Sequence, residues 1–224
     1  PRVQIVSYNK PYNPPAIANA AAALCESDYL LFLDNDTEAI SEGAISALLA
    51  DCLRSDVGVV GAKLLYPDDT IQHAGVVVGL GGVAAHVLCK LPRDAEGYMG
   101  RLRCVQEISA VTAACMMVKT SVFKAVGGFD EELKVAFNDI DLCMKVRKYG
   151  VKIIFTPYAE LYHYESKSRG MEDTPEKQLR FSREVNCFRR KWERELLKGD
   201  PYYNPNLTLN NTDCSLRKQE KNGD

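Results

Sequence analysis

Residues 29–37 read Tyr-Leu-Leu-Phe-Leu-Asp-Asn-Asp-Thr, an unbroken apolar run of strand length that ends in two carboxylates. Such a run predicts a buried strand that delivers acidic groups to its C-terminal edge, which is where open α/β sheets bind ligands. Asp34 and Asp36 are two residues apart, so both carboxylates could bind one divalent cation that carries phosphates. The two aspartates and Asn35 would also serve simply to end a strand and satisfy turn backbone groups. On this stretch alone the second explanation is favoured.

The segments around this strand alternate between strand and helix patterns. Residues 3–7 and 57–61 have the composition of strands, whereas residues 16–25 are alanine-rich and predict a helix. Ser41 is a suitable N-cap for a second helix that runs to about residue 54. This β-α-β-α-β order predicts an α/β fold with a mostly parallel sheet flanked by helices.

A different pattern follows the strand predicted at residues 57–61. Residues 62–105 are interrupted by glycine and proline and predict short strands and loops over one face. Such an insert either shapes a pocket or is an irregular surface excursion. The later elements are expected to be a strand at 114–119, a short helix at 120–126, an amphipathic helix at 139–149, a strand at 152–156 and a long helix capped by Thr174. We expect one domain over residues 1–209 and a polar, loosely ordered tail over residues 210–224.

Composition restricts the classes of partner. The chain has 224 residues and a formal net charge of -2 at pH 7, so no global basic field favours nucleic acid. The eight cysteines lie mostly in apolar settings without paired metal spacing, which indicates reduced thiols in a cytoplasmic protein. No apolar run approaches the ~18 residues of a membrane span. Peripheral association of a longer parent protein with the inner face of the membrane stays open.

Two further clusters contain polar residues that carry chemistry. Asp139 and Asp141 lie where the amphipathic helix should begin, a position at which carboxylates also act as caps and complement the helix dipole. His163 is followed by Lys167 and Arg169, which would ordinarily be a surface histidine and a solvated pair of cations. Together the clusters offer acidic ligands, a third ligand, a base and phosphate-binding cations.

Seven motifs in one order carry a family resemblance. The chain resembles a family 2 inverting glycosyltransferase of GT-A fold, of the bacterial kind that is similar to rhamnosyltransferases of surface polysaccharide assembly. The resemblance extends to about residue 209 and rests on the order of the motifs. They are residues 33–37 (LDNDT), 70–75 (TIQHAG), 114–116 (ACM), 126–130 (VGGFD), 139–143 (DIDLC), 163–166 with 168–170 (HYES, SRG) and 200–207 (DPYYNPNL).

The resemblance implies a set of metal and phosphate ligands. Asp36, helped by Asp34, would bind Mg²⁺ or Mn²⁺ on the diphosphate of the donor, and His163 would be a further metal ligand. A divalent cation held by carboxylates neutralises the charge that builds on a leaving diphosphate. Lys167 and Arg169, on a loop expected to be mobile, would close over the phosphates.

The resemblance also implies a general base. The family usually has Glu-Asp before the amphipathic helix, and the aspartate, expected to be the base, corresponds to Asp139. Asn138 stands where relatives have glutamate, which removes a charge beside the proposed base. We assign Asp141 to structure. A positioned base of this kind typically contributes ~10²–10⁴-fold to the rate.

The implied function is metal-dependent transfer of a sugar, with inversion, from a UDP- or dTDP-sugar to a saccharide or lipid-linked acceptor in cell-surface polysaccharide biosynthesis. An alternative is a catalytically inactive GT-A-like domain that binds a partner or regulates, using the surface of residues 75–89; Asn138 favours this alternative. A nucleotidyltransferase is a third alternative, but no glycine-rich phosphate loop near the N-terminus supports it.

Relatives usually start with a β-α-β unit that grips the nucleobase and ribose, and we expect this unit to be missing here. Residues 3–7 would then be a strand inside the sheet whose outer neighbours are absent. Exposed strand edges recruit partners, so we expect self-association into a homo-oligomer or a rearranged N-terminus. We also expect the isolated chain to bind nucleotide sugars weakly and to be weakly active or inactive.

Overall fold

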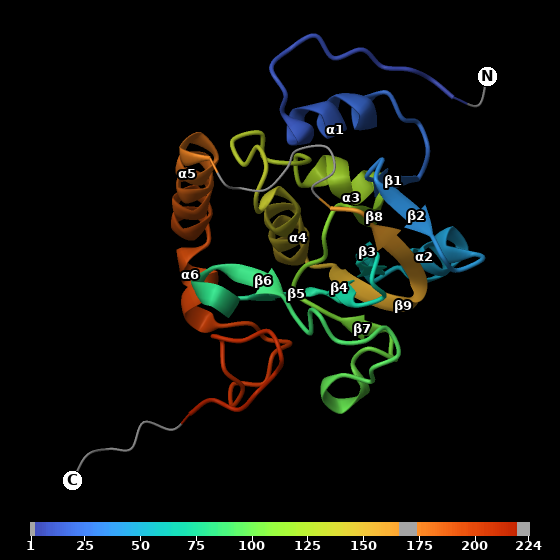
Figure 1. The fold of residues 1–224 in the computed structure, drawn as a ribbon. Coiled ribbons are helices and arrows are strands. Elements are labelled where there is room, and N and C mark those ends of the chain that lie inside the picture. The colour runs from blue at the N-terminus through green and yellow to red at the C-terminus, as the bar shows by residue number, and fades with distance from the viewer. Residues whose placement is uncertain (1–2, 166–173, 219–224) are drawn as a thin grey trace.

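The fold is a central mixed sheet with helices on both faces (Figure 1). The computed structural model describes residues 3–165 and 174–218. The helices are α1 (Pro14–Ala23), α2 (Ala44–Cys52), α3 (Thr120–Ala125), α4 (Asn138–Tyr149), α5 (Pro175–Lys191) and α6 (Glu193–Lys198), with the short 3-10 helices η1 (Leu80–Gly82) and η2 (Tyr98–Gly100). The strands are β1 (Tyr29–Leu33), β2 (Thr37–Ala39), β3 (Val57–Leu65), β4 (Ile71–His73), β5 (Val76–Val78), β6 (Ala84–His86), β7 (Gln106–Glu107), β8 (Cys115–Lys119) and β9 (Lys152–His163).

The main sheet has the strand order β1-β8-β3-β9-β2, with β4 paired to β3 and β7 paired to β9. Within the described residues, β3 and β9 are the one parallel pair, so the α/β architecture contains a mixed sheet and not the mostly parallel sheet predicted. The insert between β3 and β8 explains the difference. It leaves from the C-terminal end of β3 and returns the chain to the same end, since Met116 pairs with Gly61, so β8 runs antiparallel to β3.

The strand predicted at residues 3–7 does not form. Val3 is 76% exposed and Ile5 is 89% exposed, and the segment pairs with no strand of the described chain. The prediction that it lies inside the sheet is therefore wrong, because an apolar alternating pattern makes a strand only where a neighbouring ladder satisfies its backbone groups. β1 occupies one end of the main strand order.

The helix boundaries follow local capping. The prediction that Ser41 caps α2 is wrong, because its Oγ accepts a hydrogen bond from the backbone N–H of Glu160 at 2.9 Å. The helix begins instead after Gly43, whose φ of 79° is a left-handed conformation that glycine adopts at little cost. Thr174 does cap α5: its side chain accepts from the N–H of Lys177, and Pro175 occupies the first turn.

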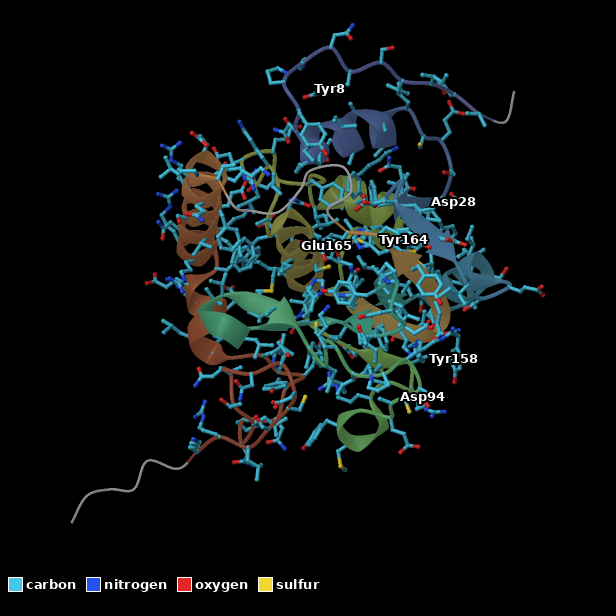
Figure 2. All side chains as sticks on the ribbon, viewed as in Figure 1. Tyr8, Asp28, Asp94, Tyr158, Tyr164 and Glu165 are labelled. Carbon is cyan, nitrogen blue, oxygen red and sulfur yellow. The ribbon has the colours of Figure 1, made fainter. Side chains whose placement is uncertain are left out.

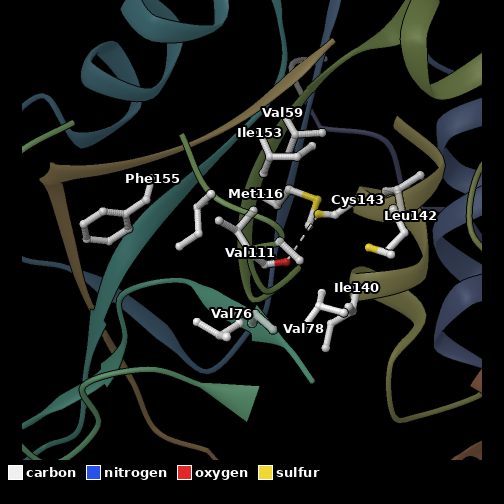
Figure 3. Close-up of a cluster of buried hydrophobic side chains, with 14 of the residues drawn as sticks. Val59, Val76, Val78, Val111, Met116, Ile140, Leu142, Cys143, Ile153 and Phe155 are labelled. Carbon is white, nitrogen blue, oxygen red and sulfur yellow. Dashed lines mark hydrogen bonds between the residues drawn. The ribbon is translucent and has the colours of Figure 1, made fainter. Parts of the chain in front are cut away.

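The core is divided by the sheet into two clusters, and successive strand residues alternate between them. Ile154 of β9 packs in the smaller cluster, which includes Leu48 and Cys52 of α2. Its neighbours Ile153 and Phe155 pack in the larger cluster on the other face. Figure 3 shows part of that cluster, where strand residues such as Val59, Met116 and Ile153 gather with Ile140, Leu142 and Cys143 of α4. The two-residue period of a strand therefore serves both layers of helices.

The insert is part of the core. Val76, Val77 and Val78 are at most 2% exposed and pack in the larger cluster, and Leu80, Val87 and Leu88 are equally buried. The alternative function that uses residues 75–89 as a partner-binding surface therefore loses its structural basis, because most of these apolar side chains are covered by the protein itself.

The segment after residue 209 is ordered further than predicted. Thr208 N–H donates to the carbonyl of Ser215 at 2.8 Å, and Leu207 forms a β-bridge with Leu216. Cys214 is 6% exposed. The expected loose tail therefore does not describe residues 211–218, because local backbone bonds and a buried thiol hold them.

Among the helices of the described chain, none is both long enough and apolar enough to cross a membrane.

Candidate active site

Three side chains with metal-ligating atoms meet at one edge of the sheet. Asp34 follows β1 directly, Asp36 lies in the turn between β1 and β2, and His163 is the last residue of β9. The pairing of Thr37 with His163 sets this register, and the N–H of Tyr164 donates to the carbonyl of Asp36 at 2.9 Å. One ligand atom from each of the three residues lies within 4.8 Å of the others.

The geometry of this cluster suits a hard divalent cation. His163 Nε2 lies 3.4 Å from Asp36 Oδ1 and 3.8 Å from Asp34 Oδ2. The side chains of His163 and Asp36 are 13% and 15% exposed, whereas that of Asp34 is 58% exposed, so the cluster opens toward solvent on the Asp34 side. Two carboxylates and one imidazole are ligands that Mn²⁺ and Mg²⁺ accept, and the open side leaves coordination positions for a phosphate or water.

Asp139 is held near this edge through the segment that precedes β8. Its Oδ2 accepts from the N–H of Ala113 at 3.2 Å, and its Oδ1 accepts from the N–H of Ile140 at 2.8 Å. The residue after Ala113 is Ala114, and its backbone carbonyl accepts from the N–H of Asp34 at 3.0 Å. Two adjacent residues therefore connect the proposed base to the acidic strand end.

The segment that precedes β8 packs closely against β3 because residue 61 of that strand is a glycine. A Cβ on Gly61 of β3 would lie 2.4 Å from the Cβ of Val111, so any larger residue would push the segment away. His73 of β4 supports it from the other side, since its buried Nε2 accepts from the N–H of Thr112 at 3.4 Å. Because burial away from water disfavours the charged imidazolium, it lowers the pKa of His73 well below its ordinary value, and His86 and His163 lower it further.

Asn138 and Asp141, the neighbours of the proposed base, have structural contacts. Asn138 Nδ2 donates to the carbonyl of Val135 at 2.9 Å, which fastens the loop that leads into α4. Asp141 is fully buried and accepts from Trp192 Nε1 at 2.8 Å, and its Oδ1 lies 2.7 Å from Lys191 Nζ. These contacts fit the assignment of Asp141 to structure.

The two proposed phosphate-binding cations, Lys167 and Arg169, lie outside the described residues. Glu165 is the last described residue before these two cations, and it follows Tyr164 after the end of β9 (Figure 2).

One residue of this neighbourhood received no role from the sequence. Gln72 of β4 is 3% exposed, and its Oε1 lies 2.7 Å from His163 Nδ1. It belongs to the TIQHAG motif (residues 70–75), which supported the family resemblance but predicted no role for any of its residues. Two adjacent polar residues, Gln72 and His73, in a short strand were the available signal, but the partner of Gln72 is 91 residues away.

The residues 4–184 match the family described as "Glycosyltransferase like family 2". The chain is 50% identical over 216 residues to the uncharacterized protein y4gI of Sinorhizobium fredii, which covers 96% of this chain and 24% of that protein. It is 38% identical over 225 residues to the O-antigen biosynthesis protein RfbC of Myxococcus xanthus, which covers 100% of this chain and 17% of RfbC. The chain thus spans a quarter or less of the length of these two relatives.

Solved structures share the fold. The mannosyltransferase PcManGT of Pyrobaculum calidifontis, in complex with GDP-Man and Mn²⁺, superposes with a TM-score of 0.57 at 14% identity, covering 85% of this chain and 46% of that one. GalNAc-T7 with UDP, GalNAc and Mn²⁺ also gives a TM-score of 0.57, at 13% identity, covering 80% of this chain and 35% of that one. These likenesses confirm the GT-A-like α/β fold. The family match over residues 4–184 shows that the chain belongs to the glycosyltransferase family 2-like proteins.

Proposed function

We propose that this chain carries the metal and acceptor site of a glycosyltransferase that moves a sugar, with inversion, from a nucleoside diphosphate sugar to an acceptor hydroxyl. The observation that carries this proposal is the meeting of Asp34, Asp36 and His163 at the sheet edge, with ligand atoms within 4.8 Å of one another. Family membership supports it, as do the GDP-Man and Mn²⁺ named with one solved structure and the UDP, GalNAc and Mn²⁺ named with the other.

Asp36 and His163 would be the inner ligands of the cation, because their side chains are largely covered and each is held by neighbouring strands. Asp34 would bind from the solvent side. A bound Mn²⁺ or Mg²⁺ would neutralise charge on the departing diphosphate without requiring a proton.

Asp139 would accept the proton of the acceptor hydroxyl as that oxygen attacks the sugar carbon and the bond from this carbon to the diphosphate breaks. Each of its oxygens accepts one backbone N–H, which fixes the carboxylate while leaving lone pairs for the incoming hydroxyl. One nucleophilic attack opposite the leaving group gives inversion. This role requires no second carboxylate, so Asn138 would act through its bond to Val135.

The donor is proposed to be a UDP- or dTDP-sugar, and the acceptor a saccharide or a lipid-linked saccharide of a cell-surface polysaccharide. The O-antigen biosynthesis protein among the relatives supports this class of product. All eight cysteines are free thiols, which supports a reaction on the cytoplasmic side of the cell.

Titration of the chain with MnCl₂, with and without UDP, tests the metal site. We expect the wild-type chain to bind Mn²⁺ and to bind it more tightly with UDP, since the diphosphate supplies further ligands. Asp36→Ala should abolish binding, whereas the matched control Asp94→Ala, at an exposed aspartate of the insert, should leave it unchanged.

Equal Mn²⁺ binding by Asp36→Ala and wild type would show that the ligand assignment is wrong. Mn²⁺ binding that UDP does not change would contradict the proposal that the cation binds the donor diphosphate.

A further inference from the structure

We infer that Gln72 is the positioning residue of this site: its side-chain amide fixes the tautomer of His163 so that Nε2 turns its lone pair toward Asp34 and Asp36. The inference rests on the proposed metal site and adds a residue to which no role has been given. Gln72 does not touch the proposed cation and acts through His163.

Three contacts connect the Gln72 side chain to the end of β9. Oε1 lies 2.7 Å from His163 Nδ1. Nε2 donates to the backbone carbonyl of His163 at 3.2 Å and to Glu165 Oε2 at 3.3 Å. The Gln72 amide therefore binds both the ring and the main-chain carbonyl of His163.

The neighbours of the amide determine which way it faces. The carbonyl of His163 and the carboxylate of Glu165 are acceptors only, so the NH₂ group of Gln72 must face them. Oε1 then faces His163 Nδ1, and because Oε1 can only accept, Nδ1 must carry the hydrogen. The opposite orientation would place Oε1 against two acceptor oxygens, which is unfavourable.

The tautomer decides what the cluster can do. A neutral imidazole with its hydrogen on Nδ1 has a free electron pair on Nε2, the atom that lies 3.4 Å from Asp36 Oδ1 and 3.8 Å from Asp34 Oδ2. Three groups then present electron pairs to one point, as a divalent cation requires. The other tautomer would place an N–H there and would exclude a cation. Metal-bound histidines generally rely on such a partner at the second ring nitrogen.

Gln72 is itself rigidly held. β4 pairs with β3, and Ile71 also exchanges backbone bonds with Lys90 and Leu91 on its other side. The carbonyl of Gln72 accepts from His86 Nδ1 at 3.1 Å and from Cys89 Sγ at 3.2 Å. Gln72 is only 3% exposed, so its amide is shielded from solvent and the acceptor is in place before any cation arrives.

The tautomer is directly measurable because the chain has three histidines. In the metal-free wild-type chain, at a pH where the rings are neutral, two-bond ¹H–¹⁵N spectra should show His163 with its hydrogen on Nδ1; His163→Ala identifies its signals. Gln72→Met, which has a similar shape but no acceptor, should shift His163 toward the Nε2–H form. A wild-type His163 that carries its hydrogen on Nε2 would overturn the inference.

Mn²⁺ titration of the same chains supplies the second readout. Gln72→Met should weaken Mn²⁺ binding by about 10–100-fold, the usual effect of losing such a partner. Gln72→Glu keeps an acceptor oxygen for Nδ1–H but places its second oxygen against the His163 carbonyl and the Glu165 carboxylate, at a cost in stability. It should retain the tautomer and weaken Mn²⁺ binding less than Gln72→Met does. The matched control Asp94→Ala, at an exposed aspartate of the insert, should leave both readouts unchanged.

Equal weakening by Gln72→Met and Gln72→Glu would contradict the inference, because packing or the NH₂ group would then be responsible. If Gln72→Met fails to fold, the tautomer of His163 in wild type and in Gln72→Glu still tests the inference. Absence of Mn²⁺ binding by the wild-type chain would overturn the proposed metal site, whereas the tautomer in the metal-free chain would still report on Gln72.

Discussion

Asp141→Asn tests whether the buried carboxylate in α4 is a structural residue, in contrast to Asp139 two positions earlier. Asp141 is 0% exposed. Its Oδ1 accepts from Trp192 Nε1 at 2.8 Å and lies 2.7 Å from Lys191 Nζ, and its Oδ2 lies 3.5 Å from Lys145 Nζ. Asparagine has nearly the same shape, so the substitution removes the charge and one acceptor without opening a cavity.

The expected cost follows from the cations that lose their partner. Removing one member of a buried ion pair costs about 3–5 kcal/mol. Lys191 keeps its contact with Asp130 at 2.5 Å and its side chain is 34% exposed, and Lys145 still donates to the carbonyl of Gly128. The lower end therefore applies, about 3 kcal/mol. For a chain of this size that corresponds to a Tm lower by about 6–12 °C.

Urea unfolding followed by circular dichroism measures this difference, with Asp139→Asn as the matched control. The control should stay within about 1 kcal/mol of wild type, because Asp139 is only partly buried and bonds to two backbone N–H groups. Adding Lys145→Met to Asp141→Asn should recover part of the loss, since it removes the cation whose ion-pair partner was Asp141. An Asp141→Asn chain within 1 kcal/mol of wild type would refute the reasoning.

Three further outcomes are expected. In a sugar-transfer assay, Asp139→Asn should lower turnover by at least ~10²-fold with little change in donor KM, measured by steady-state kinetics; near-normal turnover would exclude Asp139 as the base. Burial lowers the pKa of His73, so below about pH 6.5 the unfolded chain binds a proton that the folded chain does not, and wild-type stability should fall with falling pH by up to about 1.4 kcal/mol per unit. His73→Gln should lack this component when urea unfolding is compared at pH 7.5 and 5.5, and equal slopes would contradict it. Glu184→Gln should cost about 1–3 kcal/mol in urea unfolding, because the Glu184 carboxylate accepts from the N–H groups of Val135 and Ala136, and an unchanged midpoint would contradict that.

The sequence alone determined the elements whose signals are local. The apolar run of β1 and the two aspartates after it predicted a buried strand that ends in carboxylates. The structure has β1 over Tyr29–Leu33, but only Leu30 of this strand is buried. The helix α4 and its end at Gly150, with φ of 102°, followed from apolar spacing and a glycine stop. The ordered motifs predicted the family, which the comparisons confirm. These signals are readable because periodicity, capping and motif order depend on residues near one another in the chain.

The tertiary structure alone decided the direction and pairing of the strands. Residues 3–7 and β1 both have apolar strand patterns, yet only β1 has a neighbour with which to pair. The antiparallel direction of β8 depends on where the insert returns the chain, which no local pattern specifies.

The same holds for the roles within the candidate site. Asp139 and Asp141 are chemically identical and two residues apart, but only Asp141 is enclosed, by Trp192 and Lys191 from the other end of the chain. Gln72 reaches His163 across 91 residues through two strands that flank β3. Burial and hydrogen-bond partners are properties of packed elements, so residue type and spacing named the acids and the histidine, and the packing of the strands and helices decided what surrounds each of them.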